Sequence, residues 1–229
     1  MKIGVFGDSF AAKHWFSDIW WQCLKDYGHD VTSYGEAGSS ILYSAKMIDQ
    51  HAHNFDFLIW GLTCPGRISL QINDSDHVHL TLKKHPSKFF ELEEFDFKKK
   101  LQTYNDYLKY LYVAEDENMI GQAIAHYFMQ KYQNLMIVPC FRPPLQVKFN
   151  LYKLSEWELQ HLFSENQSWE EIHQKYRDVR VGHLTNANNK ILADLINQNL
   201  KPGIFQTEYS NFKAPDVPFD QLLHYNFRI

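Results

Sequence analysis

The chain has 229 residues, of which 45% are hydrophobic and 16% aromatic, and its formal net charge is −4. This composition supplies enough apolar material for a packed core, which excludes a disordered chain. The weak negative charge provides no global basic field, so nucleic acid is not an expected partner. The three cysteines, Cys23, Cys64 and Cys140, are far apart and form no C-x-x-C pair, which indicates neither a disulfide framework nor a zinc site.

The N-terminal third of the chain alternates between strand-like and helix-like segments. The periodicity predicts strands and helices in turn: a strand over Lys2–Phe6, a helix over about 11–27, a strand over 29–34, a helix over about 41–51 and a strand over 55–60. The last of these strands is a nearly continuous apolar run, as a sheet covered on both faces requires.

The rest of the chain is less regular. Residues 68–90 are polar and rich in histidine, and we expect an excursion of low regularity there. The remaining predicted segments are helices over about 95–113 and 118–133, a last main strand over 135–139, an inserted lid or flank over 142–177, and a final helix over 186–200.

Strands that alternate with helices predict an α/β fold, a three-layer α/β/α sandwich with a mostly parallel central sheet of flavodoxin-like type. We expect a single domain over 1–229 with helical insertions at about 68–133 and 142–177. The tail at about 204–229 is expected either to pack on its own domain or to cover a neighbouring subunit, which would make a homo-oligomer. Ligands in this architecture bind at the carboxyl ends of the strands.

The location of the protein is also constrained by its hydropathy. The N-terminus forms a strand followed by a turn and lacks the long apolar stretch of a signal peptide. No segment approaches the roughly 20 apolar residues that a membrane-spanning helix needs. We therefore expect a cytoplasmic protein with no membrane partner.

Ser9 is the first candidate for chemistry, because it lies where the first strand ends and a helix is predicted to begin. The free N–H groups and the positive end of a helix dipole favour an alkoxide or an oxyanion at that place. The alternative is that Ser9, or its neighbour Asp8, only caps the helix, since serine and aspartate are favoured at that position.

Three further segments each follow a predicted strand or precede the last helix, in the order that a known family shows. Together with Gly7–Phe10 they resemble the sequence blocks of the SGNH (GDSL-like) hydrolases: residues 35–40, 60–63 and 178–184. The resemblance implies that Ser9 is the nucleophile and His183 its general base. It also implies that the N–H groups of Ser9 and Gly38 form the oxyanion hole.

Two positions depart from the family pattern. Thr63 stands where the family has the asparagine of the oxyanion hole, and its hydroxyl is a candidate to replace that donor. Loss of one such donor costs on the order of 100-fold to 1,000-fold in rate. Arg180 stands where the family has the acid that orients the histidine, and an arginine cannot fill that role. Asp178 is then the nearest substitute, although it can equally be an ordinary surface acid.

The stretch from Thr63 to Arg67, with Pro65 between them, resembles most closely a divergent group of SGNH-like proteins found in bacteriophages. This resemblance extends the cytoplasmic expectation to the cytoplasm of a host cell. Arg67 is a candidate to bind a carboxylate or phosphate of the substrate by a two-pronged hydrogen bond, or to form an ion pair with a neighbouring acid. Arg142, just after the strand that ends near Cys140, is a weaker candidate for the same crevice.

The function that the resemblance implies is hydrolysis of an ester through an acyl-enzyme, with no cofactor and no metal. The expected substrate is a small-molecule or carbohydrate ester. Two other functions stay open: a binding or structural module whose catalytic residues have decayed, and a flavodoxin-like phosphate or nucleotide binder. Against the latter, the chain has no G-x-G-x-x-G and no Gly-Lys-Ser/Thr sequence.

Overall fold

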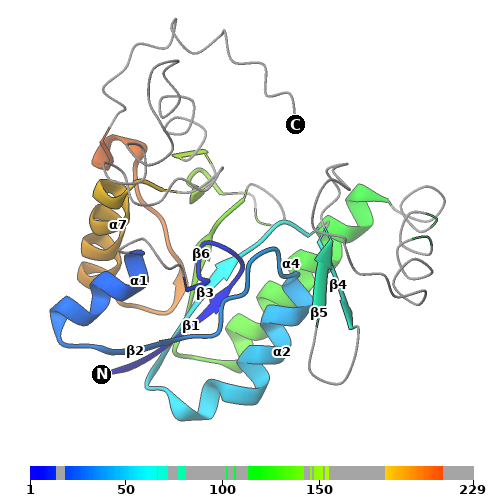
Figure 1. The fold of residues 1–229 in the computed structure, drawn as a ribbon, viewed down its shortest axis with the longest axis horizontal. Coiled ribbons are helices and arrows are strands. Elements are labelled where there is room, and N and C mark those ends of the chain that lie inside the picture. The colour runs from blue at the N-terminus through cyan, green and yellow to red at the C-terminus, as the bar shows by residue number, and fades with distance from the viewer. Residues whose placement is uncertain are drawn as a thin grey trace, which may run out of the picture.

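The computed structural model describes residues 1–13, 19–65, 67–71, 77–80, 102, 106, 113–141, 145, 147–151, 153–154 and 184–213. Within these ranges a central sheet of five parallel strands has the order β2-β1-β3-β6-β7 (Figure 1). Its strands are β1 (Lys2–Gly7), β2 (Asp30–Ser33), β3 (Phe57–Leu62), β6 (Leu135–Pro139) and β7 (Gly203–Ile204). The prediction of an α/β fold with a mostly parallel sheet is confirmed.

Helices cover both faces of this sheet, which gives three layers (Figure 1). They are α1 (Trp20–Cys23) and α7 (Asn186–Gln198) on one face, and α2 (Ile41–His51) and α4 (Ala114–Lys131) on the other. Successive side chains of a strand point to opposite faces. In β3, Ile59 accordingly joins the core beneath α1 and α7, whereas Trp60 joins the core beneath α2 and α4. All six residues of β3 are buried, as its apolar sequence predicts.

The predicted start of the first helix is wrong, whereas its C-terminal part, from Trp20 to Tyr27, is helical. The chain after β1 forms a turn, in which the carbonyl of Asp8 accepts hydrogen bonds from the N–H groups of Ala11 and Ala12, both at 2.8 Å. Ala12 then pairs with Gly35 in an isolated parallel bridge, so the backbone there is extended. The first helical residue that the structure describes is Trp20, and a 3₁₀ turn over Leu24–Tyr27 continues α1.

Two features of the strands were not predicted. The strand over 135–139, predicted as the last main one, is followed by the two-residue β7, which pairs with it in parallel, with Ile137 beside Ile204. A strand of two residues is too short for any periodic signal, and the Pro202-Gly203 pair at its start indicates only the end of a helix. The predicted irregular excursion contains a β-hairpin, in which β4 (Ile68–Gln71) pairs antiparallel with β5 (His77–Leu80).

The start of the tail packs on its own domain. Phe205 and Phe212 are buried, and both rings lie against Phe149, with ring centroids 5.9 and 5.6 Å from it. The remainder of the tail and most of both the predicted helix over 95–113 and the insertion over 142–177 lie outside the described residues. Among the helices of the described residues, none is both long and apolar enough to cross a membrane.

The strand order creates a switch point between β1 and β3. From β1 the chain runs to β2 on one side of it and then to β3 on the other. The connections on the two sides diverge there, and the usual ligand position in open α/β sheets lies outside the carboxyl ends of the two strands at such a point. The residues that follow β1 and β3 at this point are the turn that begins at Asp8 and the loop that begins at Thr63.

Candidate functional site

Asp8 is the most deeply buried charged group at the switch point, with none of its surface exposed. Its Oδ2 atom accepts a hydrogen bond from the Thr63 hydroxyl at 2.8 Å and a charge-assisted one from Nη1 of Arg67. Its Oδ1 atom accepts the backbone N–H of Phe10 at 3.1 Å. A buried carboxylate needs this many donors to offset its lost hydration. The Asp8 side chain therefore joins the β1 turn to the loop after β3.

Arg67 is held in this site from two sides. Besides its ion pair with Asp8, its guanidinium carbon lies 4.9 Å from the ring centroid of Phe141, an arrangement that favours a cation–π interaction. The Phe141 ring in turn packs edge-on against Phe10, with centroids 5.8 Å apart. The arginine side chain keeps 14% of its surface exposed. Of the two roles that the sequence leaves open for Arg67, the ion pair is present, and substrate binding stays a prediction.

Thr63 is fully buried, and its hydroxyl donates to Asp8. A hydroxyl carries a single hydrogen for donation. The same hydroxyl cannot donate to Asp8 and to an oxyanion in one arrangement, so the predicted oxyanion role requires it to rotate away from the carboxylate. That role stays a prediction.

Cys140 lies directly after β6 and close enough to this ion pair for the charges of Asp8 and Arg67 to act on its thiol. It is fully buried, and burial raises the pKa of its thiol well above the ordinary value, with a further increase from the charge of Asp8 and a partial offset from Arg67. A raised pKa keeps the sulfur in its weakly nucleophilic thiol form. Cys140 is therefore an apolar filler of the site, and nucleophilic chemistry falls to other residues.

The loop that carries Gly38 is attached to the end of β1. The carbonyl of Gly7 accepts hydrogen bonds from the backbone N–H of Glu36 and from the hydroxyl of Ser39, both at 3.0 Å. Gly38 itself has a φ of +80°, which L-residues rarely adopt. The structure thus brings the segments of Ser9 and Gly38 together at one strand end, as the sequence predicts. Ser9 is partly exposed there.

A second attachment holds the far side of the Ser9 turn. The Ser33 hydroxyl donates to the carbonyl of Ala11 at 2.5 Å and accepts the N–H of Gly35 at 3.1 Å. The two backbones approach so closely that a Cβ atom on Gly35 would lie 2.4 Å from the carbonyl carbon of Ala11. Glycine is therefore required at position 35. Sequence reasoning missed this role, although the position lies inside the segment that resembles a family block.

The predicted base and its acid, His183 and Asp178, lie outside the described residues, and so does Arg142. The description resumes at Leu184, which is buried. Thr185 then caps α7, because its hydroxyl accepts the N–H of Asn188 at 3.3 Å.

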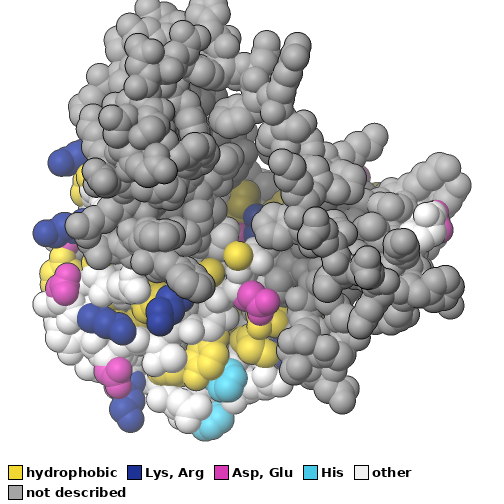
Figure 2. Space-filling model, viewed as in Figure 1, with side chains coloured by type: hydrophobic (Ala, Val, Ile, Leu, Met, Phe, Trp, Pro, Cys, Tyr) yellow, Lys and Arg dark blue, Asp and Glu magenta, His cyan; other side chains and the backbone are white. Residues whose placement is uncertain are grey.

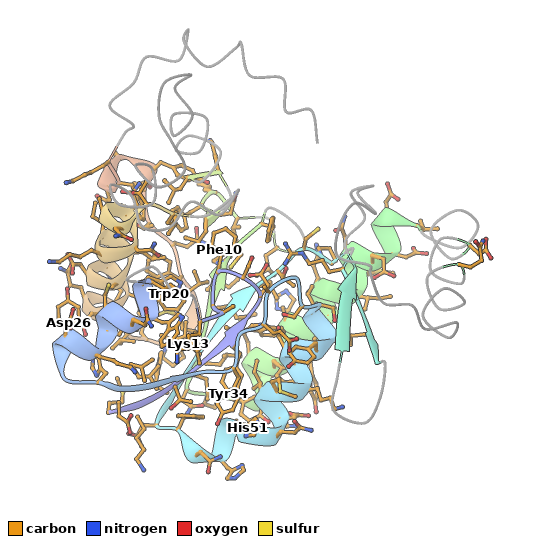
Figure 3. The ribbon with its side chains drawn as sticks, in the orientation of Figure 1. Phe10, Lys13, Trp20, Asp26, Tyr34 and His51 are labelled. Atoms are coloured by element: carbon orange, nitrogen blue, oxygen red, sulfur yellow. The ribbon has the colours of Figure 1, made fainter. Side chains whose placement is uncertain are left out.

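A buried polar bridge connects this segment to the Ser9 turn. The indole N–H of Trp20 donates to the carbonyl of Phe10 at 2.8 Å (Figure 3). The backbone N–H of Trp20 donates to Oδ1 of Asn189 at 3.1 Å, and the amide nitrogen of Asn189 donates to the carbonyl of Leu184 at 3.1 Å. The residue after Ser9 and the residue after His183 are thus joined through two side chains. No sequence signal marks Trp20 or Asn189 for this role.

Figure 2 shows acidic and basic side chains interspersed over the described part of one face. Among the described residues, no group of three or more His, Cys, Asp or Glu side chains is arranged to hold a metal ion.

Comparison with known proteins adds no relative, because no family model and no curated protein matches this chain.

Proposed function

We propose that the protein is a serine-dependent ester hydrolase. Ser9 Oγ attacks the ester carbonyl while His183 accepts its proton, and Asp178 orients the imidazole. The N–H groups of Ser9 and Gly38 stabilise the oxyanion, with the Thr63 hydroxyl as an additional donor once it turns from Asp8. His183 then gives the proton to the departing alcohol, and water hydrolyses the acyl-enzyme by the same route.

One observation carries this proposal: Gly7, two residues before Ser9, and Phe10, directly after it, are each connected by hydrogen bonds to a neighbour of a residue that the mechanism needs. On one side, Gly7 binds Ser39, the neighbour of Gly38. On the other side, Phe10 is connected through the polar bridge to Leu184, the neighbour of His183. The Ser9 turn and the Gly38 loop thus meet at one strand end at the switch point of the sheet, where α/β proteins bind ligands. The link from Phe10 to Leu184 supports the proposal that His183 acts at the same strand end.

The turn at Ser9 changes the physical basis of the proposal. Because helix α1 begins at Trp20, its N-terminus does not directly follow Ser9, and the dipole of α1 has no part in the proposed mechanism. Electrostatic stabilisation of an oxyanion then depends on backbone N–H groups held in fixed positions by the surrounding hydrogen bonds. The substrate class follows the sequence prediction of a small-molecule or carbohydrate ester, with Arg67 and Arg142 as candidates to contact its polar groups.

One observation favours a second candidate, a binding or structural module that has lost catalysis. The only hydrogen of the Thr63 hydroxyl is donated to Asp8, so the third oxyanion donor is occupied in this arrangement. The usual acid position is also filled by Arg180. The two candidates differ in whether Ser9 is chemically activated.

A fluorophosphonate probe tests this difference, because it reacts with serine hydroxyls that a general base activates. We expect labelling of the wild type at Ser9, located by mass spectrometry, together with hydrolysis of p-nitrophenyl acetate. Ser9→Ala and His183→Ala should abolish both. Ser210 is exposed and remote in sequence from the switch point, and Ser210→Ala is the matched control that should react like the wild type.

An unlabelled wild-type protein that is folded by circular dichroism would overturn the hydrolase proposal and favour the binding module. Labelling that persists in Ser9→Ala would assign the reaction to another residue. Hydrolysis that persists in His183→Ala at the wild-type rate would remove His183 from the mechanism.

A further inference from the structure

Helix α4 carries apolar side chains on two opposite sides. Its inner side packs on the sheet: Ala125 and Phe128 are buried, and the Phe128 ring lies 5.6 Å from the Trp60 ring between centroids. Its outer side exposes 63% of Met119, 47% of Ile120 and 56% of Tyr127. A helix at the surface of a protein ordinarily has polar residues on the side that faces away from the core. The apolar outer side of α4 therefore points to a second contact.

The exposed apolar side chains follow one line along the helix. Met119, Ala123 and Tyr127 are four residues apart, a spacing that places them on the same side. Ile120 lies within one turn of Ala123, which is exposed as well. Single exposed apolar residues are normal, whereas apolar side chains that gather in one patch are typical of an interaction site. These four residues are called the α4 stripe below.

Charges of opposite sign lie at the two ends of the α4 stripe. Glu115 and Asp116 are exposed in the first turn of the helix, and Lys131 is in its last turn. The Lys131 side chain is 39% exposed, and its Nζ atom lies 2.7 Å from a carboxylate oxygen of Asp49. An ammonium group has three hydrogens to donate. Lys131 can therefore bind a second carboxylate without giving up Asp49.

The α4 stripe is complementary to itself when a second copy of the helix runs antiparallel. Glu115 lies eight residues before Ala123 and Lys131 eight residues after it, while Met119 and Tyr127 lie four residues before and after it. A twofold axis beside Ala123 therefore places acid opposite lysine and Met119 opposite Tyr127, a favourable pair of thioether and aromatic ring. A twofold interface requires such self-complementarity, because both copies use the same surface.

We propose that the α4 stripe is the interface of a homodimer in which two α4 helices pack antiparallel about Ala123. Apolar burial favours the association, and the small side chain of Ala123 lets the helices approach closely at the axis. The charges determine the direction, since a parallel pair would place Glu115 against Glu115 and Lys131 against Lys131. This dimer is independent of the proposed hydrolase function, because no residue of α4 takes part in that mechanism.

Analytical ultracentrifugation of the full chain, at about 1 μM to 1 mM, covers the range in which weak interfaces assemble. We expect an equilibrium of monomer and dimer in the wild type. Ala123→Glu should raise the dissociation constant of the dimer by at least about 100-fold, because two like charges then face each other at the axis. Ala187 is an exposed alanine of α7, on the other face of the sheet, and Ala187→Glu is the matched control that should dimerise like the wild type.

Disulfide crosslinking tests the direction of the two helices. Helix axes that are 8–10 Å apart bring facing Cα atoms to about 3–6 Å, a separation that a disulfide can span. In an oxidised mixture of Met119→Cys and Tyr127→Cys proteins, we expect links between positions 119 and 127, identified by mass spectrometry of the joined peptides. Ala187→Cys should give no more crosslinked dimer than the wild type, which has the partly exposed Cys64.

A wild type that stays monomeric at about 1 mM would overturn the proposal and assign the α4 stripe to a different partner. A dimer that persists unchanged in Ala123→Glu would also overturn it, since the interface would then lie elsewhere. Links from 119 to 119 and from 127 to 127 would refute the antiparallel arrangement. Circular dichroism shows whether each variant is folded, and the crosslinks decide the outcome if Ala123→Glu is not.

Discussion

Replacing Arg67 by methionine tests whether the buried charge of Asp8 depends on its partner. The carboxylate has no exposed surface and the arginine side chain has 14%. Removing one member of a buried ion pair costs about 3–5 kcal/mol, because the other charge is left uncompensated. Thr63 and the Phe10 N–H still donate to Asp8 in the variant, so we expect the lower end of that range, about 3 kcal/mol.

The charge contribution is separated from the packing contribution by a double-mutant cycle with Asp8→Asn. In that background Arg67→Met loses the interaction with the Phe141 ring, worth about 0.5–2 kcal/mol. It leaves no buried charge without a partner, because the side chain at position 8 is then neutral. We therefore expect a loss of about 1 kcal/mol there and a coupling energy of about 2 kcal/mol between the two sites.

Urea unfolding, followed by circular dichroism at pH 7, measures these free energies. A loss of 3 kcal/mol corresponds to a fall in Tm of about 6–12 °C for a chain of this size. Lys131→Met is the matched control, since it breaks an ion pair with Asp49 whose members are 39% and 46% exposed. Exposed pairs contribute about 0–1 kcal/mol. An equal loss for Arg67→Met in both backgrounds would refute the reasoning.

Three further predictions concern packing and reactivity. Gly35→Ala should destabilise the fold by about 1–3 kcal/mol or more in urea unfolding, because its Cβ meets the backbone of Ala11; a variant as stable as the wild type would contradict this. Trp60→Phe should cost about 1–3 kcal/mol, because the smaller ring leaves a cavity at a fully buried position, while the indole N–H that is removed has no partner among the described residues; an unchanged free energy of unfolding would contradict the tight packing. In native protein at pH 8, iodoacetamide should modify the partly exposed Cys64 before Cys140, whose pKa is raised by burial; equal modification by mass spectrometry would contradict the burial.

Much of the fold follows from local patterns. Helix α2 has the predicted bounds, because its apolar spacing matches a helical face and Ser40 caps it by accepting the N–H of Tyr43 at 3.1 Å. The strands β3 and β6 were predictable for another reason: an apolar run of five or six residues is compatible with burial on both faces of a sheet. Strand β7 was not predictable, since its two residues carry no period and exist as a strand only beside β6.

The candidate site likewise has a part that follows from the sequence and a part that only the tertiary structure shows. The amino-acid sequence alone determined that Ser9, Gly38 and Thr63 follow strands or adjoin their ends, because parallel strands carry such residues to one edge of a sheet. Tertiary structure alone decided that Asp8 pairs with Arg67 and that Asn189 binds both Trp20 and Leu184. The reason is physical: periodicity and capping are read from residues within one or two turns of each other, whereas the partner of a buried polar group depends on which distant segments the closed core brings within about 3 Å.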